Sequence, residues 1–184
     1  MKIIMSLICM LGLYQSASAF TLRSAYKSNL CMDVNNGDPS SWRAGTNVEV
    51  WPCNGQQNQQ FNLKPLSTGG NDRIYTFQAL GKCLDVDMGF LEDWTNQSNI
   101  QVFSCNGGIN QQFRLEPKSG GWFTLRSVMN GKCLDIDLNT ANGWRYEHNV
   151  QLWNCSGESN QLWRFDALDT NDDDNDDIII LPTN

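Results

Sequence analysis

Three aspartates in the same local context are the side chains of this chain best placed to do chemistry. Asp33, Asp85 and Asp135 each follow a cysteine by two residues, and each precedes an aromatic residue by eighteen and an asparagine by twenty-five. An ionised carboxylate can accept hydrogen bonds from two adjacent hydroxyls, and an amide can donate and accept in one plane. An aromatic ring can lie flat against C–H groups. Together these groups suit a rigid ligand with one C–H face and a rim of hydroxyls.

These spacings recur because a block of thirty-one residues is written three times without insertion or deletion, at residues 31–61, 83–113 and 133–163. A unit this short can bury its apolar face only against copies of itself. The 148 residues between 20 and 167 amount to one domain. Three equal units in one domain predict a closed architecture with pseudo-threefold symmetry.

Strand-like patterns occur twice in each copy. A run rich in Thr and aromatic residues precedes the first cysteine, at residues 20–24, 75–79 and 123–127. Apolar and polar residues then alternate before the second cysteine, at residues 48–51, 100–103 and 150–153. Alternation with β-branched and aromatic residues is typical of strands, and no segment keeps a helical period. We therefore expect an all-β fold with about four strands per repeat.

The cysteines and the first residues indicate an exported protein. Residues 1–19 combine Lys2, an apolar run at 3–13 and a small-residue ending, which is typical of a secretory signal cleaved before Phe20. With Cys9 set aside inside that signal, six of the seven cysteines remain, two per repeat. Fifteen pairings are formally possible, and three equivalent bridges within the repeats are the simplest. They would join Cys31 to Cys53, Cys83 to Cys105 and Cys133 to Cys155.

Charge is uneven along the chain. The formal net charge is −7, yet residues 20–167 carry twelve basic and fourteen acidic side chains, so the body is nearly neutral. Six aspartates and no base lie in residues 168–184, which we interpret as a solvated, disordered acidic tail. A calcium loop in this tail is disfavoured because the central glycine and terminal glutamate are missing. We expect no nucleic-acid partner, no metal and no cofactor; zinc is disfavoured by the lack of Cys-x-x-Cys and by a single histidine.

The repeated pattern resembles the ricin B-type lectins, β-trefoil carbohydrate-binding modules with a Gln-x-Trp motif in each repeat. Here the motif reads Gln59-Gln60-Phe61, Gln111-Gln112-Phe113 and Gln161-Leu162-Trp163. The resemblance implies a β-trefoil over residues 20–167. It also implies that in each repeat the aspartate binds sugar hydroxyls, the aromatic stacks on the sugar, and the asparagine and the strand glutamine orient a galactose-like ring.

Carried over by position, the resemblance implies three sites. The first comprises Asp33, Trp51 and Asn58. The second comprises Asp85, Gln101, Phe103 and Asn110, and the third comprises Asp135, Gln151, Trp153 and Asn160. Glu49 replaces the strand glutamine in the first site, so a second carboxylate is expected beside Asp33. The Phe103 ring offers a smaller stacking surface than a tryptophan would. The third site matches the pattern of the family best.

Structural roles compete with these assignments. We interpret the motif glutamines and the aromatics at 61, 113 and 163 as core and turn residues, because a symmetric barrel needs the same plug from each repeat. The aspartates could cap turns, and Trp51 and Trp153 could be buried. Trp42, Trp94 and Trp144 could form a second pocket wall or pack under a loop. The repeated asparagines are interpreted as loop tethers; they are Asn47, Asn99 and Asn149.

The sequence thus predicts a secreted lectin that binds galactose-like glycan units non-covalently at several sites and is not an enzyme. A module for xylan-type plant-wall polysaccharides is an alternative within the same fold. A protein-binding trefoil, such as an inhibitor or a toxin's delivery subunit, is a second alternative. A glycosidase is disfavoured because three open, alike sites lack the single asymmetric pocket that catalysis requires. Oligomeric state is not indicated.

Overall fold

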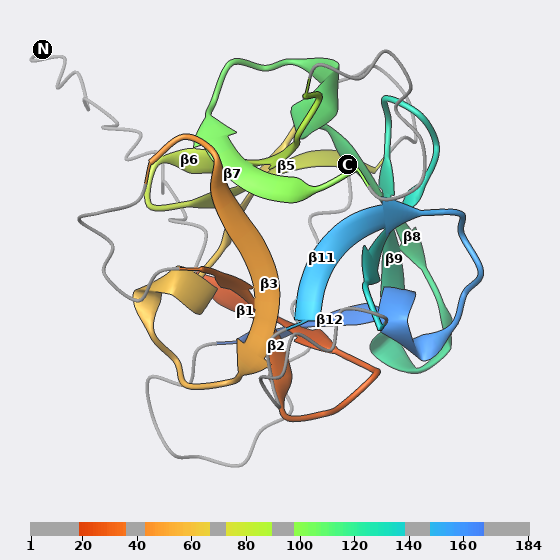
Figure 1. The fold of residues 1–184 in the computed structure, drawn as a ribbon. Helices are drawn as coiled ribbons and strands as arrows, with labels where there is room; N and C mark the ends of the chain where they lie inside the picture. The colour runs from red at the N-terminus through yellow and green to blue at the C-terminus, as the bar shows by residue number, and fades with distance from the viewer. Residues whose placement is uncertain (1–18, 36–42, 67–72, 90–97, 139–147, 168–184) are drawn as a thin grey trace, which may run out of the picture.

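The computed structural model describes residues 19–35, 43–66, 73–89, 98–138 and 148–167, and these residues form four strands in each repeat (Figure 1). The strands are β1 (Phe20–Ser24), β2 (Leu30–Val34), β3 (Thr46–Pro52), β4 (Asn62–Pro65), β5 (Ile74–Ala79), β6 (Lys82–Val86), β7 (Ile100–Ser104), β8 (Phe113–Pro117), β9 (Phe123–Ser127), β10 (Cys133–Ile136), β11 (His148–Trp153) and β12 (Trp163–Ala167). Short 3-10 turns are η2 (Gln57–Gln59), η3 (Ile109–Gln111), η4 (Ser119–Gly121) and η5 (Ser159–Gln161). The predicted all-β fold with about four strands per repeat is confirmed.

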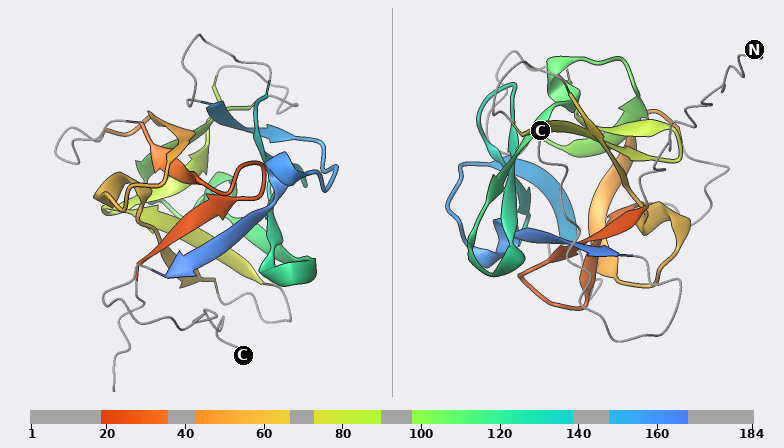
Figure 2. Two further views of the ribbon diagram at one scale, coloured as in Figure 1. Left: turned by 90° about the horizontal axis from the view of Figure 1, so that it is seen from below. Right: turned by 180° about the vertical axis from the view of Figure 1, so that it is seen from behind.

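The first and last strands of each repeat close a barrel. Antiparallel pairing runs from β1 through β12, β9, β8 and β5 to β4. An isolated bridge between Phe20 and Phe61 joins the β1 end of this series to the residue before β4. Figure 2 shows β1 and β12, which come from opposite ends of the domain, running side by side. The closed ring ties the first repeat to the third.

The two middle strands of each repeat form a hairpin, and the three hairpins meet around the pseudo-threefold axis. The hairpins are β2–β3, β6–β7 and β10–β11. Strand β3 pairs with both β7 and β11, and a bridge between Asn99 and Gln151 links the second and third hairpins. Figure 1 shows β3, β7 and β11 arranged around the centre of the molecule. This barrel with a three-hairpin cap is the predicted β-trefoil.

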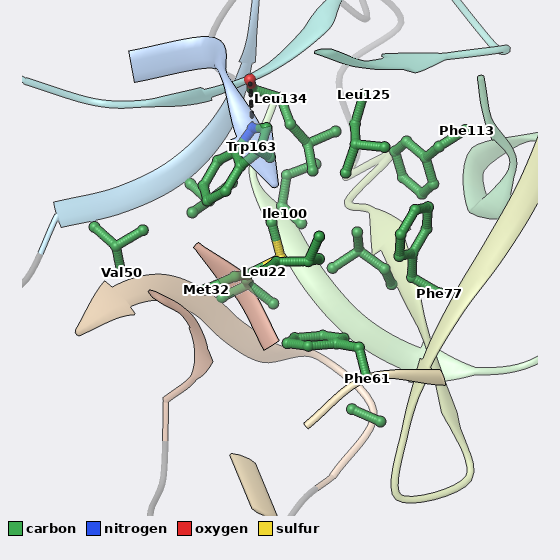
Figure 3. Close-up of a cluster of buried hydrophobic side chains, with 14 of the residues drawn as sticks. Leu22, Met32, Val50, Phe61, Phe77, Ile100, Phe113, Leu125, Leu134 and Trp163 are labelled. Carbon is green, nitrogen blue, oxygen red and sulfur yellow. Dashed lines mark hydrogen bonds between the residues drawn. The ribbon is translucent and has the colours of Figure 1, made fainter. Parts of the chain in front are cut away.

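The core lies between barrel and cap, and each repeat fills it from equivalent positions. Phe61, Phe113 and Trp163 are completely buried, as expected of symmetric plugs. They pack with alternate residues of the hairpins, including Met32 and Val50 (Figure 3). The Trp163 indole N–H donates to the Leu134 carbonyl oxygen at 3.5 Å, so the one tryptophan among the three plugs also satisfies its polar group.

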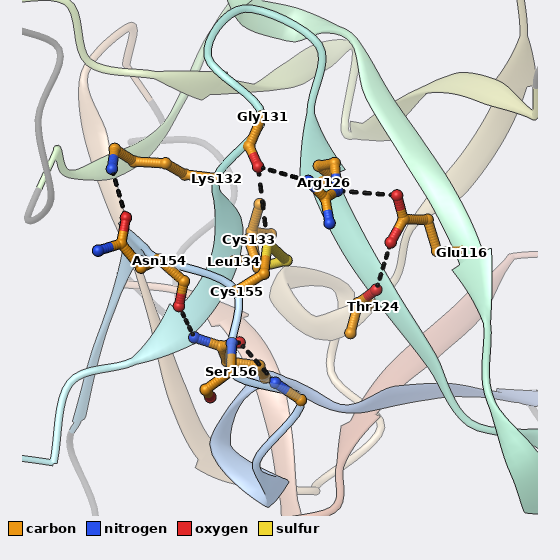
Figure 4. Close-up of a disulfide and its surroundings, with 12 residues drawn as sticks. Glu116, Thr124, Arg126, Gly131, Lys132, Cys133, Leu134, Asn154, Cys155 and Ser156 are labelled. Carbon is orange, nitrogen blue, oxygen red and sulfur yellow. Dashed lines mark hydrogen bonds and ion pairs between the residues drawn. A yellow bond between two sulfur atoms is a disulfide. The ribbon is translucent and has the colours of Figure 1, made fainter.

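All three predicted disulfides are present. Cys31–Cys53, Cys83–Cys105 and Cys133–Cys155 join the first strand of each hairpin to the segment after its second strand. Figure 4 shows the third bridge, near the Asn154 carbonyl that accepts from Gln161 Nε2 at 2.9 Å. Each bridge closes a loop with a sequence separation of 22 residues. Loops of this length typically gain about 3 kcal/mol of stability from such a link, in the chain-entropy model.

Candidate functional site

Each aspartate lies on the outer face of its hairpin, opposite a polar residue of the next strand. Asp33 pairs in register with Glu49, and Cys31 pairs with Trp51. Because side chains alternate between faces along a strand, Asp33, Glu49 and Trp51 share one face. Met32 and Val50, on the opposite face, belong to the core. The second and third hairpins repeat this register, with Asp85 opposite Gln101 and Asp135 opposite Gln151.

Two side-chain amides donate to each aspartate. In the first repeat, Asn58 Nδ2 lies 2.8 Å from Asp33 Oδ1 and Gln59 Nε2 lies 2.8 Å from Asp33 Oδ2. The other repeats also have two bonds of 2.8 Å, but both reach the Oδ2 atom of the aspartate, from Asn110 and Gln111 to Asp85 and from Asn160 and Gln161 to Asp135. The predicted grouping of acid and asparagine is therefore found in all three copies. These bonds involve side chains, so the aspartates do more than cap backbone turns.

The motif glutamines are fully buried, which confirms their interpretation as core and turn residues. The structure adds a second role. Gln59 also donates to the Pro52 carbonyl at 3.1 Å and accepts from the Asn54 amide at 2.9 Å. One side chain thus holds together the strand end, the turn after the second cysteine, and the aspartate. The glutamine of the motif is a positioning residue for the acid, and its direct contact with Asp33 is not evident from spacing alone.

Burial strongly affects the acids. Their exposed fractions are 3% for Asp33, 2% for Asp85 and 4% for Asp135. Burial raises the pKa of the Asp33 carboxyl from 3.8 to about 6, outweighing the lowering effect of the Gln59 and Asn58 hydrogen bonds. Burial likewise raises the pKa of Asp85 and of Asp135, with smaller contributions from the charges of Asp87 and Asp137. Each site thus presents a poorly hydrated carboxyl group whose oxygens can accept hydrogen bonds.

These raised pKa values predict an unusual dependence of stability on pH. A carboxyl with a higher pKa in the folded state than in the unfolded state stabilises the fold below about pH 4, and the contribution is lost as pH rises through about 6. For Asp33 it amounts to at most about 3 kcal/mol. We expect the Asp33→Asn variant, which cannot ionise there, to have a free energy of unfolding that falls less between pH 4 and pH 7 than that of the wild type.

Urea titrations at pH 4, 5, 6 and 7 measure this difference. Taking the difference between variant and wild type removes the contributions of surface acids that both proteins share. Asp166→Asn serves as the control, because Asp166 is only partly buried and forms ion pairs with Arg23 and Arg164. Parallel curves for Asp33→Asn and wild type would contradict the prediction.

The aromatic residues of the three sites remain accessible on the face that carries the acids. Trp51 and Trp153 are partly exposed, and Phe103 is 38% exposed. Each lies in register opposite the first cysteine of its repeat, two residues along the strand from the position facing the aspartate. The predicted alternative of burial is thus wrong for Trp51 and Trp153. The three aromatic rings are therefore available to stack against a ligand that the aspartate binds.

The position opposite each aspartate distinguishes the first site from the others. Gln101 Nε2 donates to Asp85 Oδ1 at 3.0 Å, and Gln151 Nε2 donates to Asp135 Oδ1 at 3.4 Å. Glu49 cannot donate when ionised; instead its Oε2 accepts from Asn35 Nδ2 at 3.0 Å. Asn35 aligns with Asp87 and Asp137, so the first repeat has exchanged an acid and an amide. Reasoning from sequence noted Glu49 but missed this exchange, which comparison of the position four after each first cysteine reveals.

Three asparagines at the centre of the cap form a closed ring of hydrogen bonds. Asn47 Nδ2 donates to Asn149 Oδ1 at 3.0 Å, Asn149 Nδ2 to Asn99 Oδ1 at 3.0 Å, and Asn99 Nδ2 to Asn47 Oδ1 at 2.9 Å. Each therefore connects two hairpins, so the prediction that these residues tether loops was incomplete. Their main-chain carbonyl oxygens also accept hydrogen bonds within each repeat, from the main-chain N–H groups of Asn35, Asp87 and Asp137. The ring fixes the three hairpin faces relative to one another.

Several predictions concern residues that the structure does not describe. Trp42, Trp94 and Trp144 lie outside the described residues, as do the tail at 168–184 and most of the predicted signal. Within the described ranges, no group of three or more His, Cys, Asp and Glu side chains is placed to hold a metal ion. The same ranges contain no helix that is both long and apolar enough to cross a bilayer.

Comparison with known proteins agrees with this geometry. A family model described as the ricin-type beta-trefoil lectin domain matches residues 18–142, and a second, described as domain-like, matches residues 110–179. Nigrin b of Sambucus nigra is 28% identical over an alignment of 109 residues, and the match covers 56% of this chain. The match spans 16% of the length of Nigrin b.

Two solved structures illustrate the similarity of fold. The designed threefold-symmetric protein ThreeFoil has a TM-score of 0.68 and 30% identity, and the match covers 80% of this chain and 96% of ThreeFoil. A lectin of Polyporus squamosus, solved bound to the epitope Neu5Aca2-6Galb1-4GlcNAc, has a TM-score of 0.63 and 18% identity. That match covers 84% of this chain and 50% of the lectin chain.

Proposed function

Because this chain belongs to the ricin-type beta-trefoil lectin domain family, and is by that membership a carbohydrate-binding protein, we propose that it is a secreted lectin that binds galactose-like units of glycans at several sites. The observation that supports this most strongly is the threefold recurrence of acid, amide and accessible aromatic on one hairpin face. Three sites on one body suit branched or clustered glycans.

Each site can bind a pyranose from its edge and its face together. The aspartate accepts from two adjacent hydroxyls through charge-assisted hydrogen bonds, while the asparagine and motif glutamine hold the carboxylate in place. The partly exposed aromatic contacts the C–H face of the ring. All of these groups are held by strands, short turns and a disulfide, so little ordering is needed on binding. The binding step is non-covalent and uses no cofactor.

The choice of galactose-like sugars follows from the family resemblance and from the position of the plates. In galactose one face of the ring is apolar while two adjacent hydroxyls remain at the rim, which matches an acid beside a flat aromatic. The ligand of the Polyporus squamosus lectin contains a galactose unit, although 18% identity relates that protein to this chain in fold alone. Secretion is supported by the signal-like residues 1–19 and by three disulfides, which persist in oxidising compartments.

We propose further that the chain binds without catalysis. Glycosidases pair two carboxylates with different protonation roles across the scissile bond. Here a neutral glutamine faces the aspartate in the second and third sites, and all three sites are open enough to leave an aromatic ring accessible. The match to Nigrin b spans 16% of that protein, so the activity of the whole relative is not transferred to this chain.

A glycan array with the full-length secreted protein tests the proposal. We expect signals on glycans with terminal galactose-like units, and inhibition of these signals by free galactose. A triple variant that combines Asp33→Asn, Asp85→Asn and Asp135→Asn should lose them. Asp166→Asn is the matched control and should bind as the wild type does. Binding to insoluble xylan with a blank array would favour a plant-wall polysaccharide module. Undiminished array binding by the triple variant, shown by circular dichroism to be folded, would contradict the proposal.

A further inference from the structure

The first site carries two carboxylates on opposing strands, where the other two sites carry an acid opposite an amide. Asp33 and Glu49 are register partners, and Glu49 is 9% exposed. In the second repeat the additional acid is Asp87, which lies exposed beyond the end of β6. The first repeat has Asn35 in place of that acid and Glu49 in place of the glutamine, so it carries the negative charge in the site and not at the end of the hairpin.

Like charges directly opposite each other in an antiparallel pair are unfavourable, because their Cβ atoms lie only about 5 Å apart. Asn35 offsets part of this repulsion through its bond to Glu49 Oε2. Burial raises the pKa of Asp33 to about 6, so its carboxyl group is mostly ionised at neutral pH, and the Glu49 carboxyl group lies opposite it on the neighbouring strand. A bound cation would relieve the repulsion, whereas a neutral hydroxyl would do so only weakly.

Asp33 also lacks a side-chain donor that the other two aspartates have. Asp85 and Asp135 each accept from a strand glutamine as well as from their two amides, and Asp33 has Glu49 in place of that donor. Asn58, which is 5% exposed, uses Nδ2 to bond Asp33 and the Val34 carbonyl. Its buried Oδ1 has no hydrogen-bond partner within the described part of the chain. The two carboxylates and the amide oxygen thus come from β2, β3 and η2 of the first repeat.

We propose that the first site selects an amino sugar, meaning a pyranose that carries a protonated primary amine among the ring substituents. This inference rests on the proposed function and specifies the ligand class of one of the three sites. An ammonium group has three donors and no acceptor, which complements a site rich in acceptors. Trp51, on the same face, contacts the C–H face of the sugar and so distinguishes an amino sugar from a small ammonium ion.

A divalent metal ion fits the first site less well. Calcium takes six to eight oxygen ligands, and the described residues around the site supply two carboxylates and one amide oxygen. Those same residues contain no cluster of three or more metal-binding side chains. A sugar ammonium needs only the hydrogen bonds already available.

The experiment isolates the first site in the full-length protein with the substitutions Phe103→Ala and Trp153→Ala, which remove the plates of the other two. Titration calorimetry at pH 7 in EDTA compares 2-amino-2-deoxygalactose and 3-amino-3-deoxygalactose with galactose and N-acetylgalactosamine. We expect at least one amino sugar to bind about tenfold more tightly than galactose, because a charge-assisted hydrogen bond replaces a neutral one. Acetylation removes the charge and should abolish the preference.

Substitutions that exchange the repeats provide matched variants. Asn35→Asp with Glu49→Gln gives the first site the pattern of the others and should eliminate the amine preference while retaining galactose binding. In a protein with Trp51→Ala and Phe103→Ala, the reciprocal pair Asp137→Asn and Gln151→Glu should confer the preference on the third site. This second variant tests the idea independently if the first folds poorly.

The outcomes separate this inference from the proposed function. If the second and third sites bind galactose and the first shows no preference for either amine, the inference is wrong and the proposed function stands. If the preference persists after the exchange at positions 35 and 49, Glu49 does not cause it and the inference is again wrong. If no site binds any of these sugars or any arrayed glycan, the proposed function itself fails.

Discussion

Replacing Trp163 with alanine should lower the free energy of unfolding by about 3–5 kcal/mol, the largest loss of stability we expect from a single substitution in this chain. Trp163 is completely buried in the core cluster, where the three repeats meet, and its indole N–H donates to the Leu134 carbonyl (Figure 3). Truncation removes a large apolar surface and leaves a cavity that three rigid repeats cannot collapse to fill.

The other repeats provide the control for this experiment. Phe61 and Phe113 occupy the equivalent positions and are equally buried, so the architecture accepts a phenylalanine plug. Trp163→Phe should therefore lose roughly 1–2 kcal/mol, from the smaller ring and the lost hydrogen bond. Trp122→Ala removes a partly exposed tryptophan that stacks with Arg164 and should cost less than about 1 kcal/mol. Urea denaturation without reductant measures all three; similar losses for Trp163→Ala and Trp122→Ala would contradict the symmetric plug.

The repeats explain why the fold could be predicted from the sequence. Two cysteines in each block restrict the plausible disulfide pairings, and alternation at residues such as 48–51 identifies the inner hairpin strands. A short repeat that cannot bury its own apolar face must assemble with its copies. These are local properties copied three times, so each copy supports the same conclusion. The acid, amide and aromatic of each site were predicted for the same reason.

Contacts between the repeats were harder to predict, because they join residues far apart in the chain. Asn47 and Asn149 lie 102 residues apart and share a hydrogen bond. Nothing in a single repeat indicates that an asparagine will complete a ring with two copies of itself, since the ring exists only after the hairpins assemble. The burial of the aspartates arises within each repeat, but it too appears only once the chain has folded. Their raised pKa values depend on the packing of β2, β6 and β10 against the turns that carry the amides.

The exchange at positions 35 and 49 shows a different limit. Glu49 was recognised as a departure from the other copies, but its meaning depends on Asn35, fourteen residues earlier in the chain, which donates to it. Considered alone, Glu49 adds a charge to the first repeat. Considered with Asn35, it moves a charge into the site and keeps the total unchanged. Register pairing, which places Asp33 opposite Glu49, is needed to see the consequence.

Removing the site aromatics one at a time should reduce binding to clustered glycans by about 100-fold per step, the largest effect on binding that we expect. A shallow sugar site typically binds with a dissociation constant of about 1 mM. Engaging a further site on the same rigid body raises the apparent affinity about 10²–10⁴-fold without any new contact. The series Trp153→Ala, then Trp51→Ala, then Phe103→Ala therefore lowers the number of engaged sites from three to none.

The decisive comparison is between a clustered and a monovalent ligand. Surface plasmon resonance on a dense glycan layer should show the stepwise loss, while calorimetry with a monosaccharide should show fewer sites and an unchanged affinity for those that remain. The substitutions preserve the core, because the three aromatics lie on the outer hairpin face and Phe103 is 38% exposed. Trp122→Ala, which removes an aromatic elsewhere on the surface, should bind both ligands as the wild type does. Equal losses for clustered and monovalent ligands would mean that one site does all the binding, and the threefold repeat would then serve the fold alone.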